Sequence, residues 1–228
     1  MIRDLRRLGT PARARASAWY FKTGKGEYGE GDIFFGLTTP RLREVARTYR
    51  DLPLHEIEIL LKNNVHECRS AALVILTWAY AHADRAARER MYRFYLAHTR
   101  WINNWDLVDI SAGDIVGEHL LEGGRKRLTR LARSPLLWDR RIAIIATGAF
   151  IARGQFADTF RIAGILLHDE HDLIHKAVGW MLREVGKRSL PAEESFLARH
   201  AAVMPRTMLR YAIEKFPPRK RAKYMAMG

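Results

Sequence analysis

The segment WINNWDLVDISAGDIVG (residues 101–117) brings large aromatic and acidic side chains together, and its place in a repeat indicates the fold. If the segment is helical from about Asn104, Trp105 and Asp109 lie four residues apart and share one face, while Asp106 points elsewhere. The pair could be a core tryptophan beside a solvated or capping acid, or it could be an aromatic ring and a carboxylate of a functional site. The rest of the chain bears on that choice.

Helix openings recur along the chain at a nearly constant spacing of 34 to 36 residues. They lie near Val65, Trp101, Pro135, His171 and Pro205. A fixed period in this range is typical of a helical solenoid, in which each helix pair packs on its neighbours. Apolar residues recur at helical spacing, and no stretch alternates for long enough to predict a strand. We therefore expect an all-α fold, a right-handed helical solenoid (α-α superhelix).

A glycine-rich segment interrupts the helical pattern near the N-terminus. Thr10 and Pro11 are a typical helix opening, but residues 23–36 hold five glycines in fourteen positions. No regular element should persist there, and the loop should be more mobile than the helices. We expect a single domain over residues 1–228, made of an N-terminal helix with this loop (10–36), helical repeats (37–216) and a basic C-terminal tail (217–228).

The chain carries a large excess of positive charge. Its 39 lysines and arginines against 25 acidic residues give a formal charge of +14. A polyanion such as nucleic acid is the first candidate partner, although ribosome-associated and membrane-surface proteins share this property. No apolar run approaches the roughly 18 residues of a membrane span, and the N-terminus lacks a signal peptide's apolar stretch. We expect a cytoplasmic protein, nucleoid-associated if bacterial, that has no membrane partner. The alternative interpretation of the Arg-rich N-terminus is a transit peptide.

One polar position recurs in every repeat, two residues before a small one. Small residues let neighbouring helices approach closely, so the polar side chains should share one face of the stack, which we expect to be concave. The position reads Arg69, Asp109, Arg141, His175 and Arg210. Asp109 is the only acid in this column. Because an acid facing a polyanion costs affinity, its presence indicates a task other than contact with the DNA backbone.

Several longer segments resemble a known family. FKTGKGEYGEGDIFFGLTTPRLREVAR, HECRSAAL, INNWDLVD, WDRRIAII and IHKAVGWMLREVGKR are similar to the DNA alkylation repair family, the AlkD-like HEAT-repeat DNA glycosylases, over about residues 19–216. In that family two tryptophans, an aspartate and an arginine line the DNA-facing cleft. The resemblance assigns these roles to Trp105, Asp109, Arg141 and Trp180. It implies a DNA repair protein of HEAT-like repeats that acts on double-stranded, alkylated DNA; we expect a monomer with no cofactor.

These residue types suit one reaction, the hydrolysis of the N-glycosidic bond of a cationic N3- or N7-alkylated purine. Departure of the base builds positive charge on the deoxyribose, which the carboxylate of Asp109 would stabilise while it positions water. Trp105 and Trp180 would pack against the sugar and the cationic nucleotide, and Arg141 would hold a phosphate. Ordinary core packing and a surface ion pair are the alternative interpretations of these side chains.

The glycine-rich loop replaces a further N-terminal helix that AlkD-like glycosylases place near the DNA. Gly24, Gly26 and Gly29 spell a dinucleotide-binding fingerprint, but no strand precedes them and no βαβ unit follows. We expect Lys22 and Lys25 in this region to lie near phosphates, together with Arg69, His175 and Arg210 elsewhere. Because part of the lesion-contacting wall is missing, the alternative function is non-catalytic binding of bent, branched or damaged DNA. A protein-binding scaffold is a third possibility that leaves the charge unexplained.

Three further features have weaker functional interpretations. His171 and His175 have the i, i+4 spacing of helical metal ligands, but the glutamate of the HExxH motif and a cysteine partner are missing, so we expect no metal site. Cys68 is the only cysteine and lies in an apolar helical run, which favours a structural role over alkyl transfer. The basic tail could clamp DNA or remain solvated.

Overall fold

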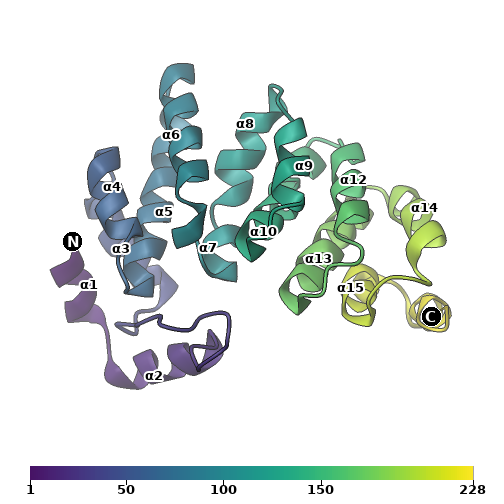
Figure 1. The fold of residues 1–228 in the computed structure, drawn as a ribbon, viewed down its shortest axis with the longest axis horizontal. Helices are drawn as coiled ribbons and strands as arrows, with labels where there is room; N and C mark the ends of the chain where they lie inside the picture. Colours follow the sequence, from purple (N-terminus) through teal and green to yellow (C-terminus); the bar gives the residue numbers. More distant parts are fainter. Residues whose placement is uncertain (228) are drawn as a thin grey trace. The chain divides into compact units, whose positions relative to one another are not determined.

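The computed structural model describes residues 1–227, and its regular structure is helical (Figure 1). Within residues 1–227 no strand is present, and the β-type pairing consists of an isolated parallel bridge between Ile33 and Val65. No helix in this range is long and apolar enough to cross a membrane. The all-α repeat fold expected from the sequence is therefore confirmed.

Contacts along the chain divide the helices into two compact units, the first being Met1–Ser111. Its helices are α1 (Ile2–Leu8), α2 (Pro11–Tyr20), α3 (Thr39–Thr48), α4 (Leu54–Leu61), α5 (His66–His82), α6 (Arg85–Ala97) and α7 (Trp105–Asp109), with a 3-10 turn η1 (Thr99–Trp101). The sequence analysis did not predict α1. The openings expected at Thr10, Val65 and Asn104 are helix N-caps in the structure.

Helix α5 is the centre of the first unit and packs against α1, α3, α4, α6 and α7 (Figure 1). Twelve of its seventeen residues are buried. A helix that is covered on nearly every side needs no amphipathic pattern, which explains the continuous apolar run from Ala71 to Leu76. The first turn of α5 is the exception, because it buries polar and charged side chains instead, beginning with His66.

The second unit begins at Ala112. Its elements are a π-helical turn η2 (Gly113–Gly117), α8 (Glu118–Leu121), α9 (Lys126–Ala132), α10 (Leu137–Ile145), α11 (Gly148–Ile151), α12 (Ala157–Ile165), α13 (Asp172–Arg188), α14 (Leu190–His200), α15 (Arg206–Ala212), a 3-10 turn η3 (Ile213–Lys215) and α16 (Pro218–Met225). Helix α13 is central and packs against α10, α11, α12, α14 and α15. Gly179 permits a close approach of α13 to α15, because a Cβ atom there would lie 2.4 Å from the carbonyl oxygen of Met208 on α15.

Small residues occupy the helix contacts in both units, as the repeat pattern predicted. The five small members of the column, Ala71, Ser111, Ala143, Ala177 and Ala212, are all 0% exposed. The basic tail is not simply a solvated end, since α16 buries Tyr224 against Phe216 and pairs Lys220 with Glu194 at 2.5 Å.

Candidate functional site

Helix α7 presents the aromatic ring and the carboxylate that the sequence analysis singled out. The Asn104 side chain accepts a hydrogen bond from the Trp105 backbone N–H at 2.8 Å, and the next two apolar residues, Leu107 and Val108, are 0% exposed. Trp105 and Asp109 are consequently one turn apart on the same side, each of them partly exposed, as the spacing predicted. A short helix anchored by its apolar side can hold this pair at the surface.

The indole of Trp105 is supported by two aromatic residues from the end of α2. Phe21 stacks on it with ring centroids 5.4 Å apart and planes 29° apart, and Tyr20 meets it edge-on at 5.8 Å. Both geometries are favourable arrangements of aromatic pairs. The sequence analysis placed Phe21 and Tyr20 in an N-terminal helix without assigning them to the site.

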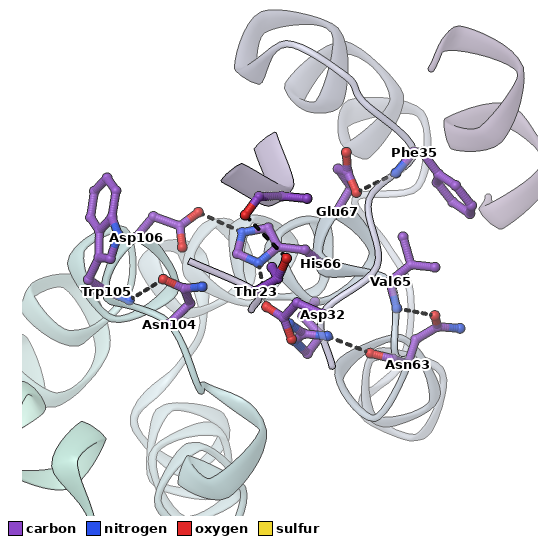
Figure 2. Close-up of polar contacts among 12 residues, drawn as sticks. Thr23, Asp32, Phe35, Asn63, Val65, His66, Glu67, Asn104, Trp105 and Asp106 are labelled. Carbon is purple, nitrogen blue, oxygen red and sulfur yellow. Dashed lines mark hydrogen bonds and ion pairs between the residues drawn. The ribbon is translucent and has the colours of Figure 1, made fainter. Parts of the chain in front are cut away.

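Beside α7, a buried histidine joins three segments of the first unit (Figure 2). His66 Nε2 lies 2.8 Å from Asp106 Oδ2 on α7, and its Nδ1 lies 3.2 Å from Asp32 Oδ2 in the glycine-rich loop. The same Asp32 oxygen pairs with Arg69 Nη2 at 2.7 Å. Because a carboxylate only accepts, both ring nitrogens of His66 donate, and the ring is an imidazolium.

Two opposing effects set the charge of this cluster. Burial alone would lower the pKa of His66, but the carboxylates of Asp106 and Asp32 outweigh burial and raise it to about 9. Burial would raise the pKa of Asp32, but His66 and Arg69 reverse that effect and lower it. With two carboxylates, one imidazolium and one guanidinium, the buried charges balance.

A further buried acid, Glu67, fixes the end of the glycine-rich loop to α5. The carboxylate of Glu67 accepts hydrogen bonds from the backbone N–H groups of Phe35 at 3.0 Å, Gly36 at 2.7 Å and Leu37 at 3.2 Å. Gly36 has a φ of +84°, and a Cβ atom there would lie 2.3 Å from the Thr10 carbonyl oxygen, so only glycine fits. The loop is irregular as expected, but its C-terminal part is fixed.

The exposed part of the loop carries the two lysines expected near phosphates. Lys22 is exposed, with its Nζ 5.3 Å from the ring centre of Trp19, and Lys25 lies in an exposed turn. The carboxylates of Glu27 and Glu30 accept from the backbone N–H groups of Gly24 and Gly26, each at 2.8 Å. Because these acids are turned toward the loop's own backbone, the lysines stay available to an anion.

Arg69 is buried and therefore cannot contact a phosphate in this conformation. Its side chain is 4% exposed, and its guanidinium pairs with Asp32 and donates to the Asn63 carbonyl oxygen at 2.9 Å. A buried guanidinium does not reach solvent, and pulling it away would leave the buried carboxylate of Asp32 uncompensated, so we leave Arg69 out of the proposed DNA contacts.

The remaining expected site residues belong to the second unit. Arg141 on α10 is 4% exposed and donates from Nη1 to the Leu173 carbonyl oxygen at 2.6 Å. Trp180 on α13 is partly exposed, and its Nε1 donates to Glu184 at 3.1 Å. His175 is partly exposed with Nε2 against the Asp169 carbonyl oxygen, and Arg210 is exposed.

The weaker candidates are explained by ordinary structure. His171 caps α13, with its Nδ1 accepting the N–H of Leu173 at 3.1 Å, and burial lowers its pKa. Among the described residues no cluster of three or more His, Cys, Asp or Glu side chains could hold a metal ion. Burial raises the pKa of the Cys68 thiol to about 11, so it is not a reactive thiolate.

Comparison with known proteins identifies the family of the chain. A family model described as "DNA alkylation repair enzyme" matches residues 1–216. The chain belongs to the DNA alkylation repair enzyme family. The fold of this family member is similar to that of a solved structure described as a predicted DNA alkylation repair enzyme from Enterococcus faecalis, with a TM-score of 0.71 and 16% identity over 92% of this chain and 97% of the other. No curated protein matches the chain.

Membership of this family supports a role in DNA repair. The sequence analysis found Trp105 and Asp109 because they are close in sequence, but it missed His66, Asp32 and Glu67, which come together only in the folded protein. One signal was present: three charged or polar residues in the motif HECR open a helix that is otherwise apolar. Buried charges at such a position are usually paired, which makes a partner in a neighbouring segment predictable.

Proposed function

We propose that this DNA alkylation repair protein is a DNA glycosylase, a hydrolase that excises purines alkylated at N3 or N7. The observation that carries the proposal is the presentation of Trp105 and Asp109 on one side of α7, both partly exposed, in a chain whose family is described as DNA alkylation repair enzymes. A carboxylate beside an aromatic ring has little value in a surface that only holds phosphates, because the carboxylate repels them. A carboxylate is useful where a reaction develops positive charge, because it stabilises that charge.

The chemistry follows from the lesion itself. Alkylation leaves the purine cationic, so the base departs with the electron pair of its glycosidic bond and leaves oxocarbenium character on the deoxyribose. The carboxylate of Asp109 stabilises that charge and orients a water molecule, whose oxygen bonds to C1′ and whose proton is released. At about 4 Å and an effective dielectric near 20, the attraction is about 4 kcal/mol, or roughly a thousandfold in rate, before desolvation is subtracted.

The other site residues bind the nucleotide. In this proposal Trp105 packs against the sugar and the cationic base and contributes about 0.5 to 2 kcal/mol. Trp180, a residue of the second unit, is proposed as a further aromatic contact with DNA. Lys22, Lys25 and Arg210 are exposed and contact phosphates, and His175 and Arg141 assist them; Arg141 does so only if its buried guanidinium is released. The substrate is double-stranded DNA, which the protein meets in the cytoplasm as a monomer.

The second candidate function is DNA binding without bond cleavage. One observation favours this function: Phe21 already stacks on the Trp105 ring, and Tyr20 packs against that ring in an edge-on geometry. Part of the aromatic surface that would contact a lesion is therefore already occupied by protein side chains. Under this alternative the protein binds bent, branched or damaged DNA through its positive charge. Asp109 then has no chemical role.

The experiment that separates the two functions is an assay for released base. Duplex DNA methylated at N7 of guanine and N3 of adenine is incubated with the protein, and the soluble fraction is analysed for 7-methylguanine and 3-methyladenine. The proposal predicts both bases, together with abasic sites in equal number. Salt-dependent binding to the same duplex without any released base would support the non-catalytic function instead.

A further inference from the structure

Two acids from distant parts of the first unit converge on one histidine (Figure 2). Asp32 comes from the glycine-rich loop and Asp106 from α7, while His66 opens α5. The side chains of Asp32 and His66 are each 4% exposed, and that of Asp106 is 22% exposed. Arg69, on the same helix as His66, pairs with Asp32 and completes the charged groups of the cluster. The cluster therefore connects the loop, α5 and α7 through His66.

Helix α7 depends on such a connection. It has five residues, and an isolated helix of this length does not hold its shape in water. Asp106 is the residue next to Trp105, and its Oδ1 is buried with no hydrogen-bond partner among the described residues. Its carboxylate relies on His66 for compensation of its charge. If the imidazolium loses its charge, the ring keeps one N–H for two carboxylates and the charge of Asp106 is no longer compensated, so we expect the first turn of α7 to move toward water.

A path of aromatic rings runs beside the path of charges. Phe34 stacks on the His66 ring with centroids 4.8 Å apart. Phe21 packs against the same His66 ring at a centroid distance of 4.8 Å, with the two planes tilted by 31°. Phe21 then stacks on Trp105. The indole of Trp105 is thus coupled to His66 twice, through the backbone of α7 by way of Asp106 and through Phe21.

We propose that His66 is a positioning residue, whose imidazolium, held between Asp32 and Asp106, sets the orientation of Trp105 and the placement of Asp109 one turn further along α7. His66 does not touch the nucleotide. The groups that face it are Asp32 from the loop, Asp106 from α7 and Arg69 from α5, together with the rings of Phe21 and Phe34. The effect on catalysis rests on the proposed glycosylase function, whereas the effect on Trp105 does not.

The first test follows Trp105 itself and needs no activity. The indole N–H signal of Trp105, assigned with Trp105→Phe, is recorded by NMR between pH 6 and pH 10, together with the ring nitrogens of His66. The proposal predicts two protonated ring nitrogens at pH 7 and a Trp105 shift that follows the loss of the His66 proton near pH 9. In Asp106→Asn, the His66 titration should move to lower pH. A Trp105 signal that ignores the His66 titration would overturn the proposal.

The second test measures base release in a single turnover at saturating methylated duplex. His66→Gln should slow release at least tenfold while its dissociation constant for undamaged duplex stays within twofold, because the DNA-contacting lysines are unchanged. The wild-type rate should fall as the pH rises through 9, and the variant should show no such fall. The matched control is His82→Gln, at the exposed end of the same helix, which should behave like wild type.

Combining the variants tests whether His66 and Asp106 act through one connection, while the unchanged affinity for undamaged duplex shows that the variants are folded. His66→Gln and Asp106→Asn should together slow release about as much as either one alone, because both break the same connection. Fully additive losses, or a rate for His66→Gln equal to wild type, would overturn the positioning role. If the wild-type protein releases no base, the glycosylase function fails, while the Trp105 signal still confirms or overturns the coupling to His66.

Discussion

The charge of His66 should make the stability of the protein depend on pH. Its pKa is raised from 6.5 in the unfolded chain to about 9 in the folded protein, a difference of about 2.5 units or roughly 3 kcal/mol. Because the folded state binds the proton more tightly, this stabilisation is fully present below pH 6.5. It is lost progressively as the pH rises through 9.

Urea denaturation followed by circular dichroism at pH 6 and pH 10, at fixed salt, measures this contribution. The free energy of unfolding of the wild type is compared with that of His66→Gln, which has no titrating ring, so that other groups cancel. We expect the difference between the two proteins to shrink by about 3 kcal/mol between the two pH values. A difference that stays constant, or that grows at high pH, would refute the charged state of His66.

Other predictions rest on separate features of the structure. Burial raises the pKa of Glu193 from 4.5 to about 8, and its Oε1 is buried without a hydrogen-bond partner in residues 1–227. The cost of ionising this carboxyl in the folded protein grows between pH 4.5 and pH 8, up to roughly 5 kcal/mol, so Glu193→Gln should raise the thermal midpoint, most of all above pH 8. An unchanged midpoint at pH 9 would contradict this. Glu67→Ala removes the acceptor for three backbone N–H groups, so hydrogen exchange at residues 35–37 should accelerate at least tenfold. Protection equal to wild type would show that the Glu67 carboxylate does not hold this part of the loop. Residues 24–27 are exposed, so their backbone amide hydrogens should exchange faster than those of any helix. Slow exchange at these residues would contradict this prediction. Affinity for duplex DNA should fall steeply with salt, and Lys25→Ala should reduce the slope of log K against log salt by about one; a slope unaltered by this change would exclude the phosphate contact.

The sequence was sufficient for the fold because the fold depends on local patterns. The repeat period and the small residues at Ala71, Ala143 and Ala177 report contacts between neighbouring helices, and these contacts are what a solenoid is made of. The start of α7 could be predicted because its cap, Asn104, is adjacent to the helix that it begins. Helix α1 was missed, since it is short and has no capping side chain.

The site was less accessible to sequence reasoning because its connections are long-range. Asp32 and His66 are 34 residues apart, and His66 and Asp106 are 40 residues apart, so no spacing rule links them. Burial was equally hidden: the recurring polar position suggested that Arg69 and Arg141 reach DNA, yet both are at most 4% exposed. A periodic pattern indicates which face a residue occupies, but not whether neighbouring side chains cover it.

The most direct test of the central claim is the rate of base release by Asp109→Asn. The substitution keeps the shape of the side chain and removes the charge proposed to stabilise the sugar cation. Compared with wild type in single-turnover excision of 7-methylguanine, the variant should be slower by about one to three orders of magnitude. Its affinity for undamaged duplex should be equal or higher, because an anion has been removed from an anion-binding surface. Asp51→Asn, which changes an exposed acid on another part of the first unit, should release the base at the wild-type rate. Equal rates for Asp109→Asn and wild type would contradict the account.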